Sequence, residues 1–468
     1  MQITLTSSIW IFLILCLLVL QLCLVLVFLI RPLFRYILGK EIASFVSRLV
    51  EDKYTQNLME LWVAGKRVSV LNILETDLRA EFGQPITRPI GSPKHFPGFD
   101  NLMFSPHQMS GPYLTQGTPV NMKVALGPKA EKPLTLRIPI MISAMGYGVA
   151  LSAEAKIALA KAAKTLQTST CSGEGPFLPE ERAAAGKYVL QIVRWAWGAR
   201  TPEEIAAADM LEVQTGQGAD MGPVRIEAKE FQGKAQELSG LTPGTAAIGL
   251  AAPPGIAKPG DWPAFMRDLR HKSHGVPLAL KLMATGNLEE DLAAALELGF
   301  DVLVIDGAQG GSHASSSIKQ DDFGLPTLLA LTRAQRFLTR QKARDKVSLI
   351  AAGGFFTPGE CLKALALGAD AIYMASVPLF SLPHRQLDKV IPWEPPTTLV
   401  FYDSLAKNKL NIEQAANSVV NAIASIVLEM EEALRALGKT SLNELSPNDL
   451  VALDALTAEI TGVKLHHN

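Results

Sequence analysis

One lysine stands where a charged side chain is costly. Lys281 interrupts the otherwise apolar residues 277–283, a run typical of a buried parallel strand. A buried ammonium group destabilises the fold unless it meets an anionic or hydrogen-bonding partner. We therefore expect Lys281 to face such a partner in a site. The alternative is a lysine at a strand end whose ammonium group reaches water.

Two turns of small residues follow the last two apolar runs of the chain. Residues 347–352 lead directly into Gly353 and Gly354, and residues 370–374 lead into Ala375 and Ser376. Backbone N–H groups in such turns can approach a phosphate closely, because no bulky side chain intervenes. Two ordinary tight turns are the alternative, but their occurrence after both final strands favours a phosphate site.

Two other loops supply small or polar residues. Residues 306–312 begin with Asp306 and continue through the glycine-rich stretch that holds Gly310 and Gly311. The second loop follows an earlier apolar run, and its small side chains leave room for a flat ring. Its central residues are Ser143, Ala144, Met145 and Gly146.

The elements that must position these residues alternate regularly from residue 137 onward. The candidate strands are residues 139–143, 167–171, 188–193, 210–214, 277–283, 301–306, 347–351 and 370–374. Helical patterns lie between most of them, at residues 152–166, 288–298, 325–341 and 359–367. This alternation predicts a parallel α/β sheet, and its eight repeats favour a closed (β/α)8 TIM barrel over a doubly wound sheet. All the loops above would then meet at one face.

The N-terminal part predicts a membrane anchor. Residues 9–30 are apolar except for Gln21. As a helix, this segment is long enough to cross about 30 Å of hydrocarbon. No charge precedes the run, whereas Arg31, Arg35 and Lys40 follow it, so the remainder is expected in the cytosol. A cleaved signal peptide is the main alternative, but the chain lacks the basic N-terminal region and the small-residue cleavage site that signal peptides have. We therefore expect a single-pass protein of the cell (inner) membrane with a cytosolic catalytic domain.

Composition and patterning divide the chain into four parts. These are a transmembrane anchor (1–35), a juxtamembrane helix with an irregular approach segment (36–136), the barrel (137–394) and a helical C-terminal tail (395–468). The net charge of -1 gives no indication of nucleic acid as a partner. The four cysteines form no CxxC pair, and we expect no metal site.

Several of these motifs, in order, resemble the FMN-binding domain of the glutamate synthase family. Residues 142–148 look like its flavin-backing strand, and residues 171–175 are similar to its Thr-Gly-Glu-Gly loop. Residues 217–219 are similar to its Gln-Gly-Ala segment, and residues 306–312 to its Asp-Gly-x-x-Gly-Gly-Thr loop. Lys281 matches its flavin-contacting lysine.

The resemblance implies an FMN oxidoreductase that acts on a CH–NH2/imine couple, as in glutamate biosynthesis. Lys281 would lie at the N1–C2=O edge of the flavin, and Glu174 would be a nearby gate or proton-handling group. The partners would be a small-molecule substrate, the lipid bilayer through residues 9–30, and an electron donor, either a separate protein or a pyridine nucleotide. The implied cofactor contacts are Ser143, Ala144, Met145, Gly146, Thr170, Gln217, Lys281, Asp306, Gly310, Gly311, Gly353, Gly354, Ala375 and Ser376.

The chain also departs from the family pattern. Residues 375–385 contain no cysteine, so the family's [3Fe–4S] cluster cannot form there, and no glutaminase domain is expected. Gln214 and Asp220 stand where the family usually has lysines, which weakens the case for a dicarboxylate substrate, although Arg225 and His313 could compensate. The alternative function is a flavin-binding scaffold or regulatory protein that has lost glutamate synthase turnover.

Overall fold

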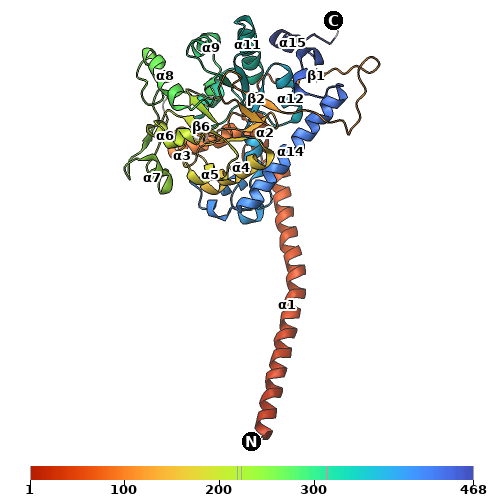
Figure 1. Ribbon diagram of the computed structural model, residues 1–468. Coiled ribbons are helices and arrows are strands. Elements are labelled where there is room, and N and C mark those ends of the chain that lie inside the picture. Colours follow the sequence, from red (N-terminus) through yellow and green to blue (C-terminus); the bar gives the residue numbers. More distant parts are fainter. Residues whose placement is uncertain (1, 219, 223, 313–314, 467–468) are drawn as a thin grey trace. The chain divides into compact units, whose positions relative to one another are not determined.

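The computed structural model describes residues 2–218, 220–222, 224–312 and 315–466. It divides into two compact units, Met1–Ile86 and Thr87–Asn468. The first unit consists of α1 (Gln2–Glu51), α2 (Glu60–Val68) and α3 (Val70–Phe82), and Figure 1 shows α1 as one long helix. The most apolar 18-residue window of residues 9–51 has a mean hydropathy of 3.3, and none of it is buried. By length and composition, α1 could therefore cross a membrane.

A parallel barrel forms the centre of the second unit. Its eight strands are hydrogen-bonded in the order β4-β13-β12-β11-β10-β7-β6-β5. They are β4 (Ile140–Ile142), β5 (Ser169–Cys171), β6 (Lys187–Ile192), β7 (Met210–Gln214), β10 (Leu278–Met283), β11 (Val302–Asp306), β12 (Ser348–Ala352) and β13 (Ala371–Met374). The predicted TIM barrel is confirmed, and each strand lies within about two residues of its predicted position.

The barrel is nearly closed between its first and second strands. No ladder joins β4 to β5, but the Thr168 hydroxyl donates to the Ile140 carbonyl at 2.6 Å. Just before the two strands, the Arg137 N–H donates to the Gln167 carbonyl at 3.0 Å. These bonds satisfy backbone groups that the missing ladder would otherwise leave unpaired.

Apolar side chains of the strands and of a short hairpin fill the interior of the barrel. Met141, Val189 and Val302 belong to one buried cluster of strand residues, because alternate side chains of each strand point inward. A hairpin of β2 (Val124–Leu126) and β3 (Leu134–Leu136) adds its leucines to the same cluster. The hairpin therefore closes the N-terminal end of the barrel with apolar side chains.

Helices follow most of the strands, and their boundaries agree with their sequences. Ser152 caps α4 by accepting from the Ala155 N–H at 3.2 Å, and Thr357 forms a capping box with Glu360 at the start of α12. The helices of the barrel region are α4 (Ala153–Leu166), α5 (Pro179–Ala184), α6 (Pro202–Ala206), α8 (Trp262–Lys272), α9 (Leu288–Glu297), α10 (Ser317–Asp322), α11 (Thr327–Arg340), α12 (Pro358–Ala366) and α13 (Ser376–Ser381).

The long connection after β7 and the C-terminal tail complete the second unit. The long connection after β7 holds α7 (Lys234–Ser239) and the pair β8 (Arg225–Ile226) and β9 (Ala247–Ile248). In the tail, α14 (Ile412–Ala436) packs against α4, as Figure 1 shows. The tail, expected to be helical, also contains a strand, β14 (Leu450–Ala452), before its last helix, α15 (Ala455–Thr461). β14 pairs with β1 (Leu102–Phe104) of the approach segment.

Candidate functional site

The strand ends bring the predicted loops together at one mouth of the barrel, in two adjoining pockets. The inner pocket has a volume of about 450 Å³ and the outer pocket about 810 Å³. Both are lined by Ala144, Gln217, Gly311, Ala375 and Ser376. The inner pocket additionally contains Ser143, Lys281, Asp306, Gln309, Gly310, Ala352, Gly353, Gly354, Phe355 and Tyr373.

Close backbone packing explains the glycines of the inner pocket. Gly353 and Gly354 both have positive φ angles, of +103° and +78°. A Cβ on Gly354 would lie 2.5 Å from the Cβ of Gln309, and one on Gly310 would lie 2.6 Å from a carboxylate oxygen of Asp306. A side chain at either position would thus collide with its neighbours, so only glycine fits there.

Lys281 lies at the floor of the inner pocket. Its side chain is only 2% exposed, and its Nζ lies 3.1 Å from Oδ2 of Asp306 on the neighbouring strand β11. The alternative in which the ammonium group reaches water is therefore wrong. Burial lowers the pKa of Lys281, but the charges of Asp306 and Glu212 outweigh it, so that the pKa is raised overall.

Asp306 uses only half of its carboxylate in this pair. Within the described residues, its Oδ1 atom is buried and has no hydrogen-bond partner. Such an atom costs about 1–3 kcal/mol unless a ligand or water satisfies it. Because Asp306 lines the inner pocket, the free oxygen marks a place for a hydrogen-bond donor of a bound group.

Glu174 lies at the outer pocket and is held by two stacked indoles. Trp195 Nε1 donates to Oε2 of Glu174 at 2.9 Å, and Trp197 Nε1 donates to its backbone carbonyl at 2.8 Å. The two rings stack with centroids 5.1 Å apart. Gln214 Nε2 donates to the other carboxylate oxygen, Oε1, at 2.7 Å. The carboxylate is thus fixed by neutral donors.

Behind Glu174 lies a second carboxylate, that of Asp220. Arg194 connects the two, because its Nε donates to Oε1 of Gln214 at 3.2 Å and its Nη2 lies 3.3 Å from Oδ2 of Asp220. Burial, and then the charge of Glu174, raise the pKa of Asp220 to about 7, although Arg194 and Lys319 lower it. The two positions that usually carry lysines in the resembling family are therefore occupied here by an amide and a buried carboxylate.

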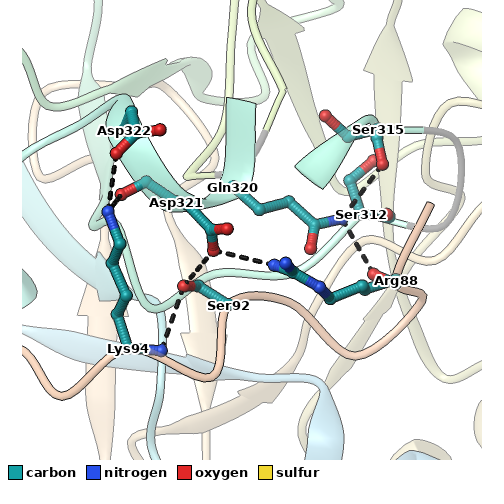
Figure 2. A network of polar contacts seen from close by, with 8 residues as sticks. All are labelled: Arg88, Ser92, Lys94, Ser312, Ser315, Gln320, Asp321 and Asp322. Atoms are coloured by element: carbon teal, nitrogen blue, oxygen red, sulfur yellow. Dashed lines mark hydrogen bonds and ion pairs between the residues drawn. The ribbon is translucent and has the colours of Figure 1, made fainter. Parts of the chain in front are cut away.

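A segment before the barrel, residues 87–94, lies over the glycine-rich loop; we call it the strap. Figure 2 shows its contacts with α10: Arg88 and Ser92 both bond Oδ1 of Asp321, at 2.8 and 2.6 Å. Lys94 bonds Oδ1 of Asp322 at 2.6 Å. A Cβ on Gly311 would lie 2.7 Å from the Ile90 carbonyl, so the strap packs directly against the loop backbone.

The residues singled out in the sequence include most of the lining of the inner pocket and about half of that of the outer pocket. Met145, Gly146 and Glu174 line the outer pocket, whereas Thr170 is buried on β5 and lines neither. Arg225 is exposed and paired with Glu227. Ala219 and His313 lie outside the described residues. The outer-pocket residues that sequence patterns did not indicate are Pro89, Ile90, Val149, Ala150, Leu151, Trp195, Leu379 and Phe401.

Comparisons with known proteins agree with this geometry. Residues 114–440 match the family described as "Conserved region in glutamate synthase". A glutamate synthase large subunit-like protein from Rhizobium meliloti (strain 1021) is 29% identical over 398 residues, covering 81% of this chain and 89% of that protein. An archaeal-type glutamate synthase [NADPH] from Thermotoga sp. (strain RQ2) is 26% identical over 411 residues, covering 83% and 79%.

Among solved structures, a mutant flavocytochrome b2 with pyruvate bound has a similar fold. Its TM-score is 0.50 at 17% identity, and the match covers 80% of this chain and 82% of that one. At this identity the likeness concerns the barrel architecture alone.

Proposed function

We propose that this chain, which belongs to the glutamate synthase family, is an FMN-dependent oxidoreductase that acts on a CH–NH2/imine couple. The observation that carries the proposal is the inner pocket. There a glycine-lined backbone, a buried lysine and a carboxylate oxygen without a partner among the described residues meet in about 450 Å³. Its relatives are named as glutamate synthases or as similar to their large subunit. Glutamate formation, the reaction in those names, involves a CH–NH2/imine couple.

The residues of the inner pocket fit FMN. The turns at Gly353–Gly354 and Ala375–Ser376 would hold the phosphate through backbone N–H groups. Ser143 and Ala144 would back the ring, and the free oxygen of Asp306 would accept a hydrogen bond from the bound group. Lys281 would provide the buried positive charge that stabilises a negatively charged N1–C2=O edge.

When bound, FMN would supply hydride chemistry, carrying two electrons and a hydrogen between the electron donor and the carbon of the CH–NH2/imine couple. Glu174 faces the outer pocket and would hold the proton that the substrate nitrogen gains when the imine is reduced and loses when the amine is oxidised. Gln214 and Trp195 keep its carboxylate in one orientation.

The proposed electron donor is a pyridine nucleotide or a separate protein, since several relatives are named as NADPH enzymes and the cysteines for a cluster are missing. We further propose that residues 9–30 tether the catalytic unit to the inner membrane. Fractionation of cells that express the full chain tests the tether: the protein should remain with the membranes after a high-salt wash.

A scaffold that binds FMN without turnover is the second candidate, favoured by the replacement of two cationic positions with Gln214 and Asp220. Both candidates require that the purified full chain release FMN on denaturation. They differ under anaerobic conditions: an enzyme's flavin is bleached by an amine or by NADPH, whereas a scaffold's flavin is not. A chain that takes up no FMN on reconstitution would exclude both.

A further inference from the structure

Apolar side chains make up most of the lining of the outer pocket. Its walls are formed by aliphatic and aromatic side chains from the strap, the first barrel loop, α13 and the start of the tail. The largest of them are Ile90, Met145, Val149, Leu151, Leu379 and Phe401. Such walls stabilise hydrocarbon by removing it from water, at about 25 cal/mol per Å². A polar, fully hydrated ligand would gain nothing from them.

Glu174 is the one charged side chain among the described residues that line this pocket. Its two side-chain donors, Trp195 and Gln214, are neutral, so they orient the carboxylate without cancelling its charge. A negative charge at the edge of an apolar chamber attracts a cation, and an ammonium group can both pair with it and donate hydrogen bonds.

The cations nearby are already engaged. Arg194 is 3% exposed and pairs with Asp220, and Lys281 pairs with Asp306 in the inner pocket. A dicarboxylate in the outer pocket would therefore place its charges near Glu174, with no lysine, arginine or histidine among the described lining residues to receive them. Like charges in a partly dry site are strongly disfavoured.

We infer that the outer pocket binds a primary amine with an apolar body, its ammonium group on Glu174 and its hydrocarbon against Ile90, Leu379 and Phe401. This names the substrate class for the proposed function and rests on that function for the reaction that follows binding. It separates this chain from an enzyme whose substrate is a dicarboxylate.

Three five-carbon probes test the inference: n-pentylamine, n-pentanol and glutarate. They are titrated calorimetrically into the FMN-loaded full chain in lipid nanodiscs, with empty nanodiscs subtracted. Pentylamine should bind at least about ten-fold more tightly than either other probe, as expected for one charge-assisted hydrogen bond. Glutarate binding more tightly than pentylamine would overturn the inference.

Variants locate the ammonium group. Glu174→Gln should lose about ten-fold in pentylamine affinity but none in pentanol affinity. The matched control Glu180→Gln removes an exposed carboxylate paired with Lys234 and should change neither. If Glu174→Gln fails to load FMN, Ile90→Arg provides the test. A cation at this partly exposed wall position should lower the affinity for pentylamine and raise the affinity for glutarate. Unchanged preferences in Ile90→Arg would contradict the inference.

Anaerobic absorbance spectra separate this inference from the proposed function. Bleaching of the flavin by pentylamine supports both. Tight pentylamine binding without bleaching by any amine supports the pocket assignment and refutes the reaction. Bleaching by L-glutamate, with no pentylamine binding, supports the reaction and refutes the pocket assignment.

Discussion

The inner and outer pockets adjoin each other but follow different rules. The inner pocket consists of strand-end backbone, glycines and one buried ion pair, Lys281 with Asp306. The outer pocket consists mostly of apolar side chains from segments outside the barrel strands, and Glu174 supplies the single carboxylate among its described lining residues. The family motifs contribute to both pockets, whereas the departures Gln214 and Asp220 lie on the Glu174 side, at the outer pocket. A protein can thus retain the lining of a cofactor pocket while the charged residues of the adjoining pocket differ.

The largest expected effect is at the inner glycines. Gly354→Ala should lower FMN affinity about 100-fold, because the residue has a positive φ angle and its Cβ would lie 2.5 Å from Gln309. Fluorescence titration of the apoprotein with FMN measures this. Gly359→Ala is the control, since its Cβ meets nothing closer than 4.0 Å. Equal FMN affinity in the two variants would mean that backbone packing does not define the inner pocket.

Next in size is the buried ion pair. Lys281→Met leaves Asp306 buried without its cation, which should lower the free energy of unfolding by about 3–5 kcal/mol. If the lysine also supports reduced flavin, the midpoint potential should fall by roughly 20–65 mV. Addition of Asp306→Asn should restore much of the stability but not the potential. A normal potential in FMN-loaded Lys281→Met would remove the lysine from flavin chemistry.

A smaller effect concerns Asp220, behind the outer pocket. Its folded pKa, about 7, lies above the ordinary value of 3.8, so between these pH values the folded chain holds a proton that the unfolded chain has released. The stability contributed by this proton is complete below the unfolded pKa and is lost as the pH rises through 7. Asp220→Asn should therefore show a smaller drop in melting temperature from pH 5 to pH 8 than the natural chain. An equal drop would place the carboxylate in a solvated setting.

The smallest effect should come from the strap. Asp321→Asn weakens the contact with Arg88, and the Pro89–Ile90 wall should loosen enough to reduce pentylamine affinity about three-fold, with FMN content unchanged. Asp322→Asn is the control, because its pair with Lys94 is exposed and contributes little. Loss of FMN in Asp321→Asn would show that the two pockets are not separable.

What the sequence could predict follows the same division. Strand periodicity and the lysine at position 281 locate the inner pocket, since all parallel strands end at one face. Ile90 and Phe401 could not be found this way, because they come from irregular segments whose position depends on tertiary packing. The β1–β14 pair was also missed, since three-residue strands this far apart in sequence carry no periodic signal. Thr170 has the expected polarity but lies on β5 away from both pockets.

The origin of the outer wall in the tail has a consequence for biosynthesis. A ribosome releases the chain from its N-terminus, so Ser376, the last lining residue of the inner pocket, emerges before Phe401, which closes the outer one. The strap emerges earlier still, but its contact with α10 forms only after Asp321 has been made. Until residue 401 has been translated, the outer pocket lacks this wall, and the inner pocket beside it is less enclosed.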